Sequence, residues 1–116
     1  MSSSRPVYFG VSASTVLDAT GILALSSVSR SSLAGTFNFP AGNGYYFFAF
    51  PDSFGSPAAG VGFQFGAFPV DMAGAGDGFT TTDNGWSYLP VTVGGAAYRL
   101  YRTASPQGDA LSINVQ

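Results

Sequence analysis

Six consecutive apolar residues, Tyr45 to Phe50, constrain the fold more than any other stretch of the chain. All but Ala49 are aromatic, and Phe and Tyr favour extended backbone. The turn-forming residues Pro40–Gly44 precede the run, and Pro51 follows it. Unbroken apolarity between two turn signals is typical of a central strand that is covered on both faces. We therefore expect Tyr46, Phe48 and Phe50 to be core positions.

The chain on either side of this run alternates between polar and apolar residues in short stretches. Strands are expected at residues 35–39, 61–65, 79–82, 86–89, 91–93, 96–102 and 111–115. Asp83-Asn84-Gly85 and Gly94-Gly95 predict turns, the second of which closes a β-hairpin. Residues 73–78 are expected to form a flexible loop. This pattern predicts an all-β fold, a single antiparallel β-sandwich or small barrel domain spanning residues 35–116.

The first 34 residues are richer in Ser and Ala, and we expect residues 1–34 to form an N-terminal arm or attachment segment with a first strand. That strand is placed at Pro6–Val11, after a mobile lead-in, because Pro is tolerated where a strand begins. Two interpretations remain for the stretch that follows. Asp18 can cap a short helix over residues 19–25, but Thr20 and Gly21 are poor helix formers. We favour a strand or irregular segment.

The charged residues are few and of only two kinds. Charged residues make up 9% of the chain, against about 25% in ordinary soluble domains. Lys, Glu, His and Cys are absent, and the net charge is −2. Without Lys and Glu, surface helices are disfavoured and little repulsion keeps copies apart. We expect neighbouring subunits to cover much of the surface.

The net charge and the distribution of apolar residues argue against nucleic acid and membrane as partners and against a secretory signal. A negative net charge disfavours nucleic-acid binding through a basic face. The polar N-terminus does not have the pattern of a secretory signal. No apolar run approaches the ~20 residues of a membrane helix, so no membrane partner is expected.

The residue types present argue against catalysis. Serine nucleophiles have no His or Lys to act as their base. Asp52 with Asp71, or Asp77 with Asp83, would be the candidate carboxylate pairs of a glycosidase, but each lies in or beside a predicted turn. Asp77, Asp83 and Asn84 offer oxygen ligands for calcium without the EF-hand spacing. We expect no catalytic residues, no cofactor and no metal.

Exposed aromatic side chains are the remaining candidates for a binding site. Trp86 and Tyr88 share one face of a predicted strand, and Tyr45 is a further candidate. These rings can stack on sugars of a host-surface glycan, or they can belong to the core or to a subunit interface. Arg99 and Arg102 lie on opposite faces of one predicted strand, so we expect each to form an ion pair with an Asp rather than a shared basic patch.

Three phrases of the sequence resemble one known group of proteins. They are GNGYYFFAFPDSFG at residues 42–55, NGWSY at 84–88 followed by VTV at 91–93, and YRLYRT at 98–103. Together with the closing INV at 113–115, they resemble tail- or fibre-associated β domains of tailed-bacteriophage virion structural proteins. The resemblance covers roughly residues 35–116. In such proteins the segment often ends a longer chain, so attachment is expected to involve residues 1–34 or the β domain itself.

The resemblance implies a function without catalysis. It implies a virion protein, assembled in the host cytoplasm, that contacts other virion proteins and itself oligomerises, with a trimer favoured. The main expectation is a tail- or fibre-associated subunit. One alternative is a capsid decoration protein that cements the head surface. Another is a carbohydrate-binding module for recognition of the host surface.

Overall fold

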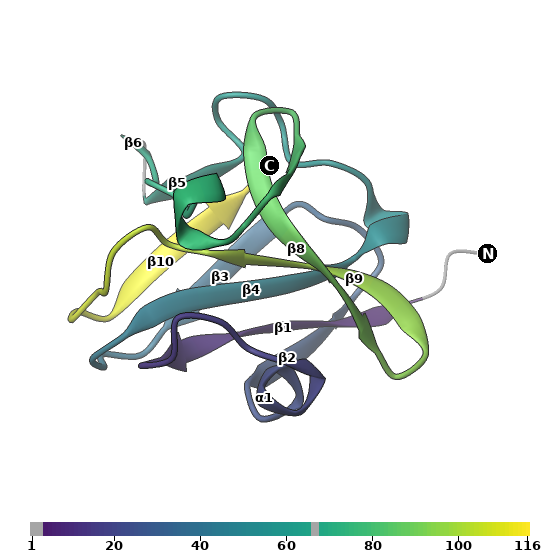
Figure 1. Ribbon diagram of the computed structural model, residues 1–116, viewed down its shortest axis with the longest axis horizontal. Coiled ribbons are helices and arrows are strands. Elements are labelled where there is room, and N and C mark those ends of the chain that lie inside the picture. The colour runs from purple at the N-terminus through teal and green to yellow at the C-terminus, as the bar shows by residue number, and fades with distance from the viewer. Residues whose placement is uncertain (1–3, 66–67) are drawn as a thin grey trace.

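The computed structural model describes residues 4–65 and 68–116, which form two antiparallel sheets packed face to face (Figure 1). The six-stranded sheet has the order β2-β1-β4-β9-β8-β7, and the four-stranded sheet has the order β3-β10-β5-β6. The strands are β1 (Arg5–Ser12), β2 (Ser26–Arg30), β3 (Gly35–Phe39), β4 (Tyr45–Pro51), β5 (Phe63–Phe65), β6 (Phe68–Pro69), β7 (Thr81–Asp83), β8 (Trp86–Val93), β9 (Ala96–Arg102) and β10 (Leu111–Val115). The predicted all-β sandwich is confirmed.

Strand β4 is covered on both faces, as its aromatic run predicts. It lies between β1 and β9 in the larger sheet. Tyr46, Phe48 and Phe50 point between the sheets, where they join a cluster that includes Phe37 and Phe63 of the smaller sheet. The alternate side chains, Phe47 and Ala49, point to the outer face and join a second cluster. All five residues of β4 that belong to these clusters are 0–1% exposed, so this strand joins two separate cores.

The two predicted turns are both present and both use left-handed backbone. Gly94 and Gly95 join β8 to β9 with φ of 58° and 81°. Asn84 and Gly85 join β7 to β8 with φ of 54° and 85°. Two consecutive residues with positive φ form the tight turn that suits the twist of a β-hairpin. The expected strand at 79–82 begins later, at Thr81.

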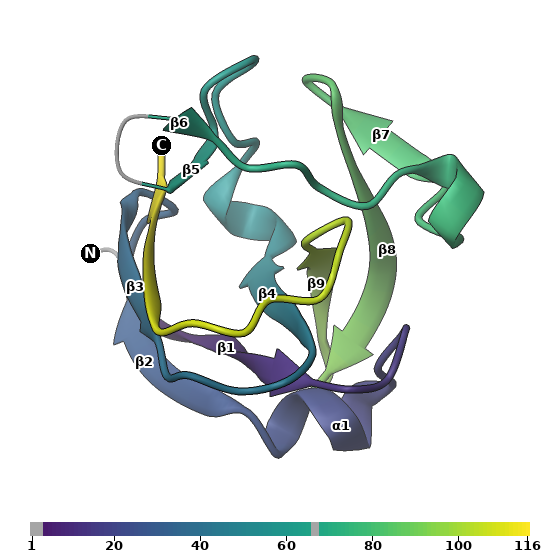
Figure 2. The ribbon, with the colours of Figure 1, turned by 90° about the vertical axis from the view of Figure 1, so that its left-hand side faces the viewer.

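A short helix, α1 (Ala19–Leu23), lies against the outer face of the six-stranded sheet (Figure 2). Our preference for a strand or irregular segment here was therefore wrong. The Asp18 carboxylate accepts a hydrogen bond from the Gly21 backbone N–H at 2.9 Å, which caps the helix. Ile22 is fully buried in the outer cluster. Capping and burial together outweigh the poor helix propensity of Thr20 and Gly21.

The predicted loop at 73–78 contains a 3₁₀ turn, η2 (Ala75–Asp77), and lies in the connection from β6 to β7. The Gly74 backbone N–H donates to the Asp77 carboxylate at 3.2 Å, and the Ala73 N–H donates to the Arg102 carbonyl at 2.8 Å. Phe79 follows with no exposed surface and packs in the outer cluster. This segment therefore covers part of the outer face of the larger sheet.

The predicted N-terminal segment contributes β1, α1 and β2 in its described part, while residues 1–3 lie outside the described residues. Strand β1 pairs with both β2 and β4, so it belongs to the six-stranded sheet. The expected boundary between residues 34 and 35 falls where the chain passes from β2 in one sheet to β3 in the other (Figure 2). No helix among the described residues is long and apolar enough to span a membrane.

Candidate functional site

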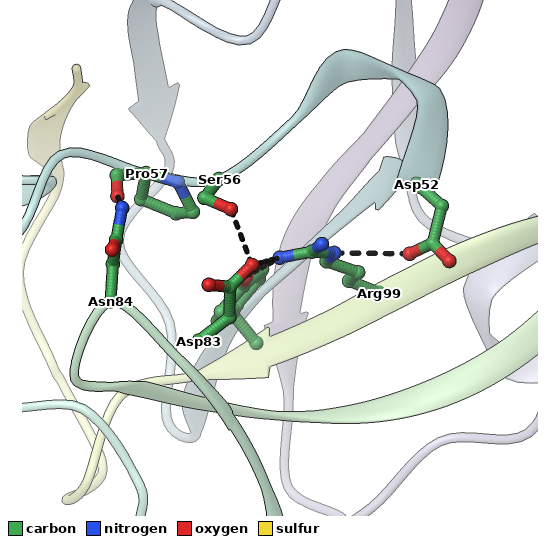
Figure 3. Close-up of polar contacts among 7 residues, drawn as sticks. Asp52, Ser56, Pro57, Asp83, Asn84 and Arg99 are labelled. Carbon is green, nitrogen blue, oxygen red and sulfur yellow. Dashed lines mark hydrogen bonds and ion pairs between the residues drawn. The ribbon is translucent and has the colours of Figure 1, made fainter.

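The predicted aromatics Trp86 and Tyr88 lie beside a polar cluster centred on Arg99. We name Asp52, Ser56, Asp83, Tyr88, Arg99 and Tyr101 the Arg99 cluster. Arg99 of β9 donates from Nε to Asp52 at 3.0 Å and from Nη1 to Asp83 at 2.9 Å (Figure 3). Its guanidinium lies over the Tyr88 ring, 4.7 Å from the centroid. The Arg99 side chain thus joins three elements. They are the turn η1 (Asp52–Phe54), strand β7 through its last residue, and strand β8 through Tyr88.

A second set of contacts joins the residues after η1 to the turn between β7 and β8. The Ser56 hydroxyl donates to the Asp83 carboxylate. The Asn84 amide donates to the Pro57 carbonyl at 3.1 Å (Figure 3), and the Trp86 indole N–H donates to the Ala58 carbonyl at 2.8 Å. These bonds come from three neighbouring residues of one hairpin, so the hairpin holds the 56–58 segment against the sheet.

The charges of the Arg99 cluster stabilise each other. The pKa of Asp83 lies below its usual value, first because Ser56 and Arg99 donate hydrogen bonds to the carboxylate. Burial alone would lower the pKa of Arg99, but hydrogen bonds to Tyr101, Asp83 and Asp52 outweigh this effect and raise it. Burial raises the pKa of Tyr101. Both partners of the ion pair are therefore fully charged at neutral pH, which suits a structural tie rather than proton transfer.

Trp86 and Tyr88 are half-buried on the inner face of β8. The Trp86 ring meets Phe63 edge-on, with 5.0 Å between centroids, and the Tyr88 ring lies 5.5 Å from that of Tyr101. The predicted shared face is confirmed. Both rings pack on core aromatics, so each has a structural contact whatever else it binds.

Tyr45 lies on the opposite face of the larger sheet, apart from Trp86 and Tyr88. Its ring packs against the guanidinium of Arg102, whose Cζ lies 4.0 Å from the ring centroid. Arg102 is 3% exposed, donates to the Thr15 carbonyl at 2.7 Å and pairs with Asp77 at 3.5 Å. The structure therefore does not bring the three predicted aromatics into one site.

The structure gives the candidate carboxylates different partners, and Asp71 has no ion pair among the described residues. Asp77 pairs with Arg102 on the outer face, whereas Asp83 pairs with Arg99 on the inner face. Asp52 also pairs with Arg99. The predicted Arg–Asp ion pairs are confirmed for both arginines. Within residues 4–65 and 68–116, His, Cys, Asp and Glu form no group of three or more that could hold a metal ion.

Two surface hollows lie next to the predicted aromatics. One, of about 320 Å³, lies between the 69–74 segment and the β7–β8 turn and is lined by Asp71, Trp86 and Ser87 among others. The other, of about 430 Å³, is lined by Tyr45, Asn43 and Gln107 among others. Each combines an aromatic ring with hydrogen-bonding groups, which is the combination that sugar recognition uses.

Sequence reasoning missed Ser56 as a member of the cluster. It also placed Asp52 in a turn and in a candidate carboxylate pair with Asp71, but did not identify its contact with Arg99. Their partners lie 27 and 47 positions away along the chain. No local pattern reveals such a contact. The signal that was available is the recurrence of Pro and Ser after a buried strand, which marks a turn but not what the turn contacts.

Comparison with known proteins yields no relative, since no family model, curated protein or solved structure matches the chain.

Proposed function

We propose that this chain is a non-enzymatic structural subunit of a tailed-bacteriophage particle, associated with the tail or its fibres. One observation carries the proposal. The first of the phrases that resemble phage tail proteins, at residues 42–55, is far in sequence from the other two, which lie on the β8–β9 hairpin, and all three meet at the Arg99 cluster. Asp52 comes from the first phrase, Tyr88 from the second and Arg99 from the third, and Arg99 contacts both of the others. The resemblance therefore coincides with one packed unit rather than with unrelated turns.

The chemistry of this unit supports a structural role. Arg99 donates to two aspartates, Asp52 and Asp83, whereas Arg102 pairs with Asp77 and donates to the Thr15 carbonyl. Each arginine thereby holds the segments that carry its partners against the larger sheet. A particle component needs such rigid loops because it must keep one shape through assembly and infection, whereas it needs no turnover.

The low charge supports oligomerisation and contact with other virion proteins. A weakly charged surface offers little repulsion between copies, and obligate interfaces are the least charged of protein interfaces. We propose a homo-oligomer, with a trimer favoured, assembled in the host cytoplasm and then retained in the virion.

Copy number in separated heads and tails tests the proposal. Particles of the phage that encodes the chain are split into heads and tails, and the chain is quantified in each by mass spectrometry against a major capsid protein. We expect the chain in the tail fraction, in a multiple of three copies per particle. Recovery with heads, in numbers that follow the capsid lattice, would overturn the tail assignment in favour of capsid decoration.

Binding of a host-surface glycan is a second candidate, favoured by the hollow beside Trp86. Asp71 is exposed there, so Asp71→Asn and Ser87→Ala change the hollow without removing the Trp86 contacts. A glycan site predicts that these variants lose binding to host polysaccharide while their melting temperatures stay unchanged. Equal binding by the variants and the unaltered chain would exclude this hollow as the site.

A further inference from the structure

Strand β2 forms one outer edge of the six-stranded sheet and carries no feature that blocks further pairing. Within the described residues, β1 is the only strand that pairs with β2 in a ladder, although the Arg30 side chain at the end of β2 reaches Thr36 and Phe37 of β3. Its sequence is Ser26-Ser27-Val28-Ser29-Arg30, with no Pro and a charge only at its end. Natural edge strands are usually short, charged, bulged or interrupted by Pro, because an open edge pairs readily with another strand.

The other edges of the two sheets are better protected. Strand β7 has three residues and ends in the ion-paired Asp83. Strand β6 consists of Phe68 and Pro69, and Pro lacks a donor. On β3, the Thr36 carbonyl accepts a hydrogen bond from Arg30 at 3.4 Å. The β2 edge thus stands out among the four.

The register identifies which backbone groups of β2 point away from the sheet. Pro6 lies opposite Ser29, and since Pro has no N–H, this pair cannot exchange both hydrogen bonds. The Pro6 carbonyl instead accepts from the Tyr98 hydroxyl at 2.8 Å, on the side of β4 and β9. Hydrogen-bonded pairs alternate along an antiparallel ladder, so Val28 bonds to β1. The N–H and C=O groups of Ser27 and Ser29 therefore point outward.

We propose that the β2 edge binds the β2 edge of a second copy of this chain, antiparallel and about a twofold axis at Val28. In this register Ser27 lies opposite Ser29 of the second copy, and these outward-pointing residues exchange both backbone hydrogen bonds. Val28 lies opposite its own symmetry mate. Because Val7 lies opposite Val28 within each chain, a continuous row of valines crosses the joined sheets on their inner face.

The charges fit this twofold arrangement. Arg30 lies opposite Ser26 of the second copy, and the two Arg30 residues are four positions apart along the strands. At about 3.3 Å per residue, this separation is roughly 13 Å, beyond the Debye length of about 8 Å at physiological ionic strength. Small Ser side chains next to the axis let the two backbones approach. The edge is thus self-complementary in backbone bonds and in apolar contact, and it brings no like charges close together.

The inference rests on the oligomeric part of the proposed function and names one of its contacts. A twofold contact joins chains in even numbers, so a trimer that uses it would associate into six copies. The contact is small by itself, but it strengthens when other contacts in the assembly hold two copies close together.

Cysteine cross-linking of the full chain tests the contact, since the natural sequence has no Cys. Val28→Cys places two thiols at a non-hydrogen-bonded antiparallel pair, where Cα atoms lie about 4.5 Å apart and a disulfide can form. Ser29→Cys is the matched control, because Ser29 is more exposed than Val28 but faces Ser27, not its own symmetry mate. On mild oxidation we expect V28C to give disulfide dimers and S29C to remain mostly monomeric. Adding Ser29→Pro to V28C removes an outward N–H but no bond to β1, and should abolish the dimer.

Two results would overturn the proposal. The first is cross-linking of S29C to the same extent as V28C, which indicates random collision. The second is a V28C chain that stays monomeric on oxidation. If, in addition, the Ser27 and Ser29 amide hydrogens exchange slowly with solvent in the particle, the edge pairs with a strand of a different protein. Because the test uses the isolated chain, its failure does not bear on the tail assignment. Recovery of the chain with heads rather than tails would likewise not bear on the edge contact.

Discussion

At the residue scale, aromatic side chains of β4 pack directly against the opposite sheet. Phe48 has no exposed surface and contacts Phe37, Phe39 and Phe63 of the other sheet, with centroid separations from 4.9 to 5.8 Å. The residue therefore holds the two sheets together directly.

Truncation of Phe48 is expected to destabilise the protein strongly. Phe48→Ala removes a buried ring and leaves a cavity, which costs about 3–5 kcal/mol of unfolding free energy. Chemical denaturation monitored by Trp86 fluorescence measures this loss. Leu23→Ala is the control, since Leu23 is 56% exposed, and it should cost less than about 0.5 kcal/mol. A loss below about 1 kcal/mol for F48A would contradict the central position of β4.

Trp86 is expected to contribute through its hydrogen bond as well as its ring. Trp86→Phe removes the indole N–H that donates to the Ala58 carbonyl, and should cost about 1 kcal/mol of unfolding free energy. Tyr88→Phe provides a matched control, because the Tyr88 hydroxyl makes no hydrogen bond within the described residues, and should cost under about 0.5 kcal/mol. Equal stability of both variants, measured by thermal unfolding, would show that the indole bond contributes nothing.

Asp83 gives the fold a dependence on pH in the acid range. Its pKa is lower in the folded chain than the ordinary value of 3.8, so folding favours the charged carboxylate. The stabilisation is complete above the ordinary value and is lost as the pH falls through the folded-state pKa. The melting temperature of Asp83→Asn should therefore lie below that of the unaltered chain at pH 7, and the difference should shrink below about pH 4.

Asp71→Asn is the control for this prediction. Asp71 is exposed and has no arginine partner in the described structure, so its variant should show no such trend. The same trend in both variants would rule out the Arg99 cluster as its cause.

At the scale of elements, local signals predicted most of the strands and both hairpin turns, but neither β6 nor the helix. Alternation placed β3, β9 and β10, and two consecutive left-handed residues at 84–85 and 94–95 followed from Asn and Gly. Helix α1 has five residues and contains Thr20 and Gly21, so propensity alone argued against it. Its stability comes from the Asp18 cap and from burial of Ile22 under the sheet, and only the second of these requires knowledge of the fold.

The cap of α1 is testable on its own. Asp18→Ala removes the acceptor for the Gly21 N–H and should cost about 1 kcal/mol, whereas Asp18→Asn keeps an acceptor and should cost less. Hydrogen exchange at the Ile22 amide, which donates to the Asp18 carbonyl, reports on the helix directly. Unchanged exchange in D18A would show that burial of Ile22 alone maintains α1.

At the scale of the whole molecule, the candidate site was predictable in its residue types but not in its connections. Strand periodicity correctly placed Trp86 and Tyr88 on one face and Arg99 and Arg102 on opposite faces. The same periodicity places Tyr45 on the outer face, because it differs in parity from Tyr46. Which aspartate meets which arginine depends on how the 51–58 segment folds over the sheet, and this is a property of the tertiary structure.

For the whole molecule, we propose that the sandwich is a tail-associated component of a phage particle. Immunogold electron microscopy of intact virions, with an antibody raised against this chain, tests it most directly. We expect gold at the tail or its fibres. Gold spread over the head, or virions that carry none, would contradict it.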